Sequence, residues 1–184
     1  MSSSDWLETS SGNRIHKSCI IKHPEFIVIS GNSTLNENCN LIVDNQKDQT
    51  ECISIGKYTY ISKNVVIETI VNKDLKEKTY SINIGSYTTI GENSKIYSMN
   101  VGSRCKIGSN CRLGAYSIIY DSCIIHDNVI IPDRYIIPPL SEVRLKINLR
   151  SENELNFYIE TLSEAYRILN EGEAKRIYIL GETA

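Results

Sequence analysis

The residues of this chain whose types could do chemistry are three histidines and six cysteines. A histidine can act as a general base, and a cluster of histidines or thiolates can hold zinc. His16 and His23 lie close to the start of the chain, whereas His126 lies far along it. The cysteines contain no C-x-x-C pair, the spacing typical of a zinc or redox motif. Whether these residues can meet depends on the elements that carry them.

A six-residue repeat organises the stretch from Ile84 to Val143. An aliphatic residue opens each hexad, glycine often follows it, and a small residue fills the fifth position. Within this stretch, the residues at the fifth position are Thr88, Ser94, Cys105, Cys111, Ser117 and Cys123. This period predicts a parallel β-helix, in which three hexads form one triangular coil and the first and fifth positions point inward. We expect the glycine after the aliphatic residue to relieve the backbone at the corner, where a Cβ would be costly.

Three columns of aliphatic residues follow when the coils are stacked. The first is Ile29, Ile55, Ile84, Val101, Ile119 and Ile137. The second is Leu35, Ile61, Ile90, Ile107, Ile125 and Val143. The third is Leu41, Ile67, Ile96, Leu113 and Ile131. Repeats of this kind are stable because each coil covers its neighbours, so these residues are the predicted core.

The cysteine positions agree with a core role. Cys39, Cys105, Cys111 and Cys123 all occupy the fifth position of a hexad, where a small inward side chain is expected. A buried thiol behaves as a small hydrophobic group. We therefore expect free core thiols rather than metal ligands or disulfides.

The rest of the chain divides around the repeats. Residues 1–26 are expected to form a lead and a cap over the first coil, which would shield its open edge. The β-helix is expected over 27–147, with polar loops at 44–51 and 71–81. A helix is predicted over 151–171 and a tail over 172–184.

The predicted helix depends on local signals. Ser151 and Glu154 form a capping-box pattern, and Gly172 would stop the helix. Apolar residues then recur at helical spacing, which predicts an inward stripe of Leu155, Tyr158, Ile159, Leu162, Tyr166 and Leu169.

Composition excludes some functions. The 184 residues carry a formal charge of −2, which does not indicate a nucleic-acid or membrane surface. No apolar run approaches the roughly 20 residues of a membrane span, and Met1–Asp5 lacks the features of a signal peptide. The expected location is therefore the cytoplasm.

Hexapeptide β-helices are best known as acyltransferases and γ-class carbonic anhydrases. An acyltransferase of this kind needs a histidine base between subunits, and His126 alone lies within the regular coils, on an outward corner. The anhydrase needs three histidines on one zinc ion, yet His16 and His23 precede the first predicted coil. Both reactions stay as alternatives to a structural function.

Residues 6–143 resemble the dynactin subunit 5 family, whose members lie at the pointed end of dynactin. The resemblance rests on the opening Leu7-Glu-Thr-Ser-Ser-Gly-Asn-Arg14 and on the terminal segments Ile130-Ile-Pro132 and Ile136-Ile-Pro-Pro139. It implies a left-handed β-helix, related to the γ-class anhydrases, with a C-terminal α-helix.

The zinc site of the γ-class anhydrases has no match in this chain. Glu68 stands where the resemblance would place the first zinc histidine, after Val65-Val66-Ile67, and the paired histidines have no counterpart around Tyr97–Arg104. The resemblance therefore implies no catalytic residue, no metal and no cofactor.

What the resemblance implies instead is a non-catalytic scaffold in dynein-based microtubule transport, associated with the cytoskeleton. The implied partners are the related β-helix subunit, dynactin subunit 6, as a heterodimer, together with the pointed-end actin-related protein and cargo adaptors.

The outward positions of the coils suggest a partner surface. Tyr58 and Tyr87 share the same position of adjacent coils, so their rings should stack. Because tyrosine is enriched at protein interfaces, we expect the wall that carries them to dock on a second β-helix.

Overall fold

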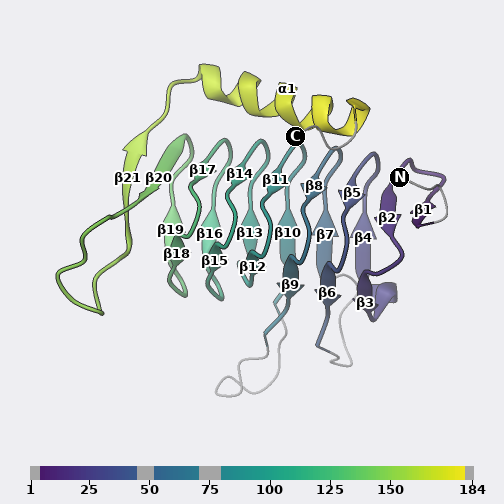
Figure 1. The fold of residues 1–184 in the computed structure, drawn as a ribbon, viewed down its shortest axis with the longest axis horizontal. Helices are drawn as coiled ribbons and strands as arrows, with labels where there is room; N and C mark the ends of the chain where they lie inside the picture. The colour runs from purple at the N-terminus through teal and green to yellow at the C-terminus, as the bar shows by residue number, and fades with distance from the viewer. Residues whose placement is uncertain (1–4, 45–51, 71–79, 181–184) are drawn as a thin grey trace.

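The structure, a computed structural model, describes residues 5–44, 52–70 and 80–180. The chain winds into a stack of three-sided coils, and each side of the stack is a sheet of short strands (Figure 1). A single helix, α1, lies along the stack in the same view. Most of the predicted loops at 44–51 and 71–81 lies outside the described residues.

The largest sheet, here called the nine-stranded wall, contains the two antiparallel ends of the fold. Its strands in order are β1 (Trp6–Glu8), β2 (Arg14–His16), β5 (Thr34–Leu35), β8 (Tyr60–Ile61), β11 (Thr89–Ile90), β14 (Lys106–Ile107), β17 (Ile124–Ile125), β20 (Ser141–Leu145) and β21 (Phe157–Thr161).

The other two sheets have six parallel strands each. The β4–β19 wall consists of β4 (Ile27–Ile29), β7 (Ile53–Ile55), β10 (Ile82–Ile84), β13 (Asn100–Val101), β16 (Ile118–Ile119) and β19 (Ile136–Ile137). The β3–β18 wall consists of β3 (Ile20–Lys22), β6 (Asn40–Ile42), β9 (Val66–Glu68), β12 (Lys95–Ile96), β15 (Arg112–Leu113) and β18 (Ile130–Ile131). A 3₁₀ turn, η1 (Pro24–Phe26), joins β3 to β4.

Strand pairing aligns the aliphatic residues in the same columns as the hexad register. Ile107, for example, pairs with Ile90 on one side and Ile125 on the other. The predicted core residues are buried except Ile29, which is half-buried. The exception follows from its place on β4, the edge strand of its wall, where no further coil covers it. The mainly parallel β-helix with a C-terminal helix confirms the predicted fold class.

The corners confirm that a Cβ would be costly at the glycines of the second hexad position. Positive φ falls on the fourth hexad position, as at Tyr58, Asn64 and Tyr87, and not on the glycine of the second position. Glycine is needed there for space: a Cβ on Gly108 would come within 2.6 Å of the Asp127 amide nitrogen. The second position thus has to be glycine wherever the next coil's corner approaches this closely.

The N-terminal boundary also differs from the prediction. Parallel pairing begins at β2 and β3, where Ile15 pairs with Leu35 and Ile21 with Leu41. The β-helix therefore starts within the segment assigned to the cap, rather than at residue 27. Before it, β1 pairs antiparallel with β2 and forms the first strand of the nine-stranded wall.

The prediction of a helix over 151–171 is wrong. Residues 157–161 form β21, which pairs antiparallel with β20, and α1 spans Ala165–Leu180. The Ser151–Glu154 signal forms a turn, in which the Glu154 carboxylate accepts a hydrogen bond from the Arg150 amide at 2.9 Å. The open edge of β20 is the physical reason, because pairing with it satisfies backbone groups that a helix would leave exposed.

The segment assigned to the tail continues the helix as far as Leu180, and Gly172 lies inside α1 rather than after it. Among the described residues, no helix is long and apolar enough to cross a membrane.

Candidate interaction surface

The three histidines lie in separate surroundings. His16 Nδ1 lies 2.7 Å from Ser18 Oγ, and its ring meets the ring of Trp6 edge-on. His23 lies 3.3 Å from the Glu25 carboxylate, next to η1. Within the described ranges, no three His, Cys, Asp or Glu residues gather into a group that could hold a metal ion.

His126 belongs to an ion-pair network at the last coil. Its Nε2 lies 2.7 Å from Glu142 Oε1, and Arg144 Nη2 lies 2.8 Å from the same oxygen. Arg144 also pairs with Glu160 on β21 at 3.0 Å. Since the carboxylate that faces His126 is shared with a guanidinium, the network joins the residue after β17 to β20 and β21 at the end of the stack.

All six cysteines are free thiols, and five of them are buried. Burial raises the pKa of the Cys111 thiol to about 11, so it stays protonated at neutral pH. Cys105 Sγ donates a hydrogen bond to the Tyr120 carbonyl of the next coil, at 3.2 Å. These thiols fill the core as the hexad positions predict.

The family-like opening motif builds the turn between β1 and β2. Asn13 is buried, and its backbone amide donates a hydrogen bond to Thr9 Oγ1 at 3.0 Å. Its side-chain oxygen accepts from the Ser33 amide at 3.0 Å, which ties the turn to the next coil. Gly12 has a φ of +80°, a conformation that favours glycine. The motif therefore has a structural role at the first coil.

Tyr58 and Tyr87 stack as their shared position predicts, with ring centroids 5.4 Å apart and planes 6° apart. Helix α1 covers them. The Tyr178 ring meets Tyr58 edge-on at 5.4 Å, and Lys175 Nζ lies 5.1 Å from the Tyr87 ring centre. The prediction that these tyrosines face another chain is therefore corrected, because the chain's own helix occupies the surface.

Charged groups hold α1 against the same coils. Glu171 lies 2.7 Å from Lys175 and 2.8 Å from Arg104, and these two cations lower the pKa of the Glu171 carboxyl to about 2. Asn170 is buried and donates a hydrogen bond to the Arg104 carbonyl at 2.9 Å. The helix is thus fixed by polar contacts rather than by an apolar stripe.

The β4–β19 wall presents an uncharged row to the outside. Strand pairing aligns one outward residue from each of its six strands: Val28, Ser54, Asn83, Asn100, Ile118 and Ile136. By contrast, Lys95 and Arg112 lie side by side on the β3–β18 wall, and Arg14 and Lys106 lie on the nine-stranded wall. Charged residues are depleted at the centre of protein interfaces, so the outward row of the β4–β19 wall has the composition of an interface centre.

Comparison with known protein families gives a match to the family described as "Dynactin subunit 5" over residues 1–154. The chain belongs to the dynactin subunit 5 family. The resemblance drawn from the opening motif and the hexads is therefore confirmed. Membership in a family of dynactin subunits implies protein partners within a complex. The matched residues include every coil of the β-helix and exclude β21 and α1.

Solved structures with similar folds include hexapeptide proteins from bacteria. A hexapeptide transferase family protein from Anaplasma phagocytophilum is 14% identical, with 88% of this chain and 90% of that chain covered and a TM-score of 0.47. A candidate acetyltransferase from Bacillus cereus is 15% identical, with 94% and 91% covered and a TM-score of 0.43. Likenesses this distant carry no argument about what a dynactin subunit 5 family member does. Among curated proteins, none matches the sequence.

Proposed function

We propose that this chain is a non-catalytic structural subunit of a dynactin-like complex. In this role it lies at the pointed end, beside dynactin subunit 6 and the pointed-end actin-related protein. It supports cargo adaptors in dynein-based transport, in the cytoplasm and on the cytoskeleton. The observation that carries the proposal is the family match over residues 1–154, which spans the whole β-helix.

The surroundings of the histidines support a non-catalytic role. His126, the candidate base of an acyltransferase, is tied to Glu142 within an ion-pair network. Glu68, at the position matched to a zinc histidine, ends β9 on the outside of the β3–β18 wall. The three histidines thus have separate partners, and Glu68 replaces the histidine that the anhydrase alternative needs.

The partner surface in this proposal is the β4–β19 wall. Its outward row is uncharged from Val28 to Ile136, and Ile136 is 55% exposed. A flat row of short strands can lie side by side with a wall of a second β-helix, so that apolar and amide groups meet without burying a charge. This wall replaces the tyrosine surface as the proposed docking site for dynactin subunit 6.

The test is to mix this chain with purified dynactin subunit 6 and measure the mass by light scattering. We expect a 1:1 complex. Ser54→Arg combined with Ile136→Arg places two cations on the row and should weaken the complex by at least about tenfold.

The matched control is Lys95→Glu, which changes a charge on the neighbouring β3–β18 wall and should leave the affinity unchanged. Absence of a complex would contradict the heterodimer. A complex that tolerates the double substitution would instead exclude this wall as its surface.

A further inference from the structure

Helix α1 packs with its apolar side outward. Its most buried residues are Asn170 and Ala174, and Tyr178 continues the same face. On the opposite face, four aliphatic side chains are 60–71% exposed: Ile168, Leu169, Ile179 and Leu180. A surface helix of a globular protein normally has the reverse arrangement, with its apolar stripe toward the core. The exposed stripe thus needs an explanation outside the described fold.

Gly172 lies in the middle of this exposed face. A Cβ added to it would meet no atom within 4 Å, so packing in the chain itself does not require glycine. Glycine lowers the stability of a helix interior relative to alanine, and it allows another backbone or a long side chain to approach closely. The position is therefore suited to contact with another chain.

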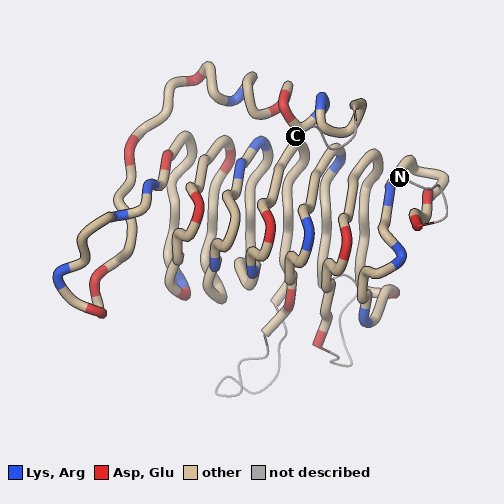
Figure 2. Tube along the Cα trace, in the orientation of Figure 1, with Lys and Arg blue, Asp and Glu red and all other residues tan. Residues whose placement is uncertain are grey.

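The exposed face is symmetric about Ala174. Residues at equal distances on either side are Ile168 and Leu180, Leu169 and Ile179, and Gly172 and Arg176. Opposite charges flank the same point, because Glu173 directly precedes Ala174 whereas Lys175 and Arg176 directly follow it. Along α1 in Figure 2, a basic position near the start is followed by acidic and then by basic positions.

From this pattern we propose that two copies of the chain associate through α1, with the two helices antiparallel and crossing at Ala174. A two-fold axis at this point brings Ile168 of one copy to Leu180 of the other. It also places Arg176 of each helix near Glu173 of its counterpart. A parallel pair in register would align Arg176 with Arg176 and Glu173 with Glu173, so these two positions favour the antiparallel orientation.

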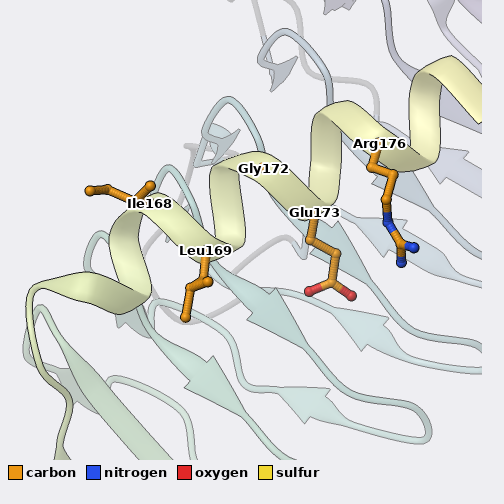
Figure 3. Close-up of a pocket in the computed structure, with 5 residues that line it drawn as sticks. All are labelled: Ile168, Leu169, Gly172, Glu173 and Arg176. Carbon is orange, nitrogen blue, oxygen red and sulfur yellow. The ribbon is translucent and has the colours of Figure 1, made fainter.

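Arg176 and Gly172 would form the centre of the contact. A shallow hollow of about 440 Å³ runs along α1, lined by Ile168, Leu169, Gly172, Glu173 and Arg176 (Figure 3). Arg176 has no ion-pair partner among the described residues, whereas Glu173, which lines the same hollow, pairs with Lys106 at 2.9 Å. In the antiparallel dimer, Arg176 of one copy lies over Gly172 of the other and reaches its Glu173.

This surface is separate from the one in the proposed function. The contact lies on α1, outside the residues that match the family, whereas the proposed subunit 6 surface is the β4–β19 wall. Either association can fail without affecting the other.

The first test is the mass of the purified full-length chain as a function of concentration, by sedimentation equilibrium. Two 16-residue helices offer a contact about 24 Å long, at the small end of specific interfaces, so we expect a dimer with a micromolar dissociation constant. Gly172→Leu fills the space for Arg176 and should raise that constant at least about tenfold. The variant should keep the thermal stability of the monomer, because leucine is a better helix former and meets no atom there.

The matched control is Ile147→Asp, which adds a charge at a 93% exposed isoleucine away from α1 and should leave the dimer intact. A chain that stays monomeric at about 100 μM, well above a micromolar dissociation constant, would overturn the proposal. So would a dimer that Gly172→Leu does not weaken.

The antiparallel orientation of the two α1 helices has a separate test. Ile168→Cys mixed with Leu180→Cys should give a cross-linked pair under mild oxidation, beyond the background of the unsubstituted chain. Ile168→Cys alone should not. Self-cross-linking of Ile168→Cys would mean parallel helices and would contradict the proposed contact.

Discussion

The Tyr178 hydroxyl donates a hydrogen bond to the Gly12 carbonyl at 2.9 Å, which joins the end of α1 to the turn before the first coil. The same side chain carries a second contact to that end, since the Arg14 guanidinium lies 4.7 Å from the Tyr178 ring centre. One residue near the C-terminal end of the described chain thus secures the helix to the opposite end of the stack.

Tyr178→Phe tests this attachment. The substitution keeps the ring on Tyr58 and removes the hydroxyl that donates to the Gly12 carbonyl and lies 3.1 Å from Asn32 Oδ1, so we expect a loss of about 1 kcal/mol in the free energy of unfolding. Urea unfolding measures it, and hydrogen exchange in the last turns of α1 should become faster. Tyr166→Phe, at an exposed position of the same helix, is the control and should change neither quantity.

Ile107→Asp tests the core register. Ile107 is buried between Ile90 and Ile125, and a carboxylate there would have no partner. We expect the variant to lose its cooperative unfolding transition. Lys95→Asp, on the outside of a neighbouring coil, should stay within about 0.5 kcal/mol of the unsubstituted chain. A soluble Ile107→Asp protein that melts like the original would refute the register.

Two glycine substitutions should change the free energy of unfolding in opposite directions. Gly108→Ala puts a methyl group 2.6 Å from the Asp127 nitrogen, which requires the backbone to shift and should cost about 1–3 kcal/mol. Gly172→Ala adds a methyl group in open space within a helix and should stabilise the monomer by about 0.5–1 kcal/mol. Thermal unfolding at low protein concentration compares them, and equal effects would contradict the different roles assigned to these glycines.

The Glu171 ion pairs predict a pH dependence of stability. The carboxyl pKa in the folded chain is about 2, below its ordinary value of 4.5, because Lys175 and Arg104 favour the charged form. A lowered folded pKa means that the stabilisation is present above about pH 4.5 and is lost as the pH falls toward 2. We therefore expect Glu171→Gln to lower the free energy of unfolding at pH 7, and this difference should shrink between pH 4.5 and 2. Concentrated salt should reduce it at pH 7, since the carboxylate is partly exposed.

Metal analysis tests the non-catalytic assignment. The three histidines have separate partners, so we expect no stoichiometric zinc, iron or cobalt in the purified chain. Carbon dioxide hydration should be no faster than in buffer, with a zinc-loaded γ-class anhydrase as the positive control. One metal ion per chain, removed by a chelator together with hydratase activity, would favour the enzyme alternative.

The hexads predict the β-helix and its register because the information is local and repeated. Each inward position contacts the equivalent position of adjacent coils, so a column such as Ile90, Ile107 and Ile125 can be aligned by period alone. The stack of Tyr58 on Tyr87 follows from the same rule. The sequence by itself therefore determined the fold class, the columns and the stacked pair.

The conformation of the segments outside the repeats depends on tertiary contacts. Residues 155–169 have a helical spacing of apolar residues, yet Phe157–Thr161 pairs with the open edge of β20, and α1 begins only at Ala165. Which face of α1 is buried depends on Arg104, Tyr58 and the Gly12 turn, which lie far from it in the sequence. A repeat period predicts only how one repeat packs on the neighbouring repeats. Contacts that occur once, between distant segments, set the position of α1 and therefore which surfaces remain for partners.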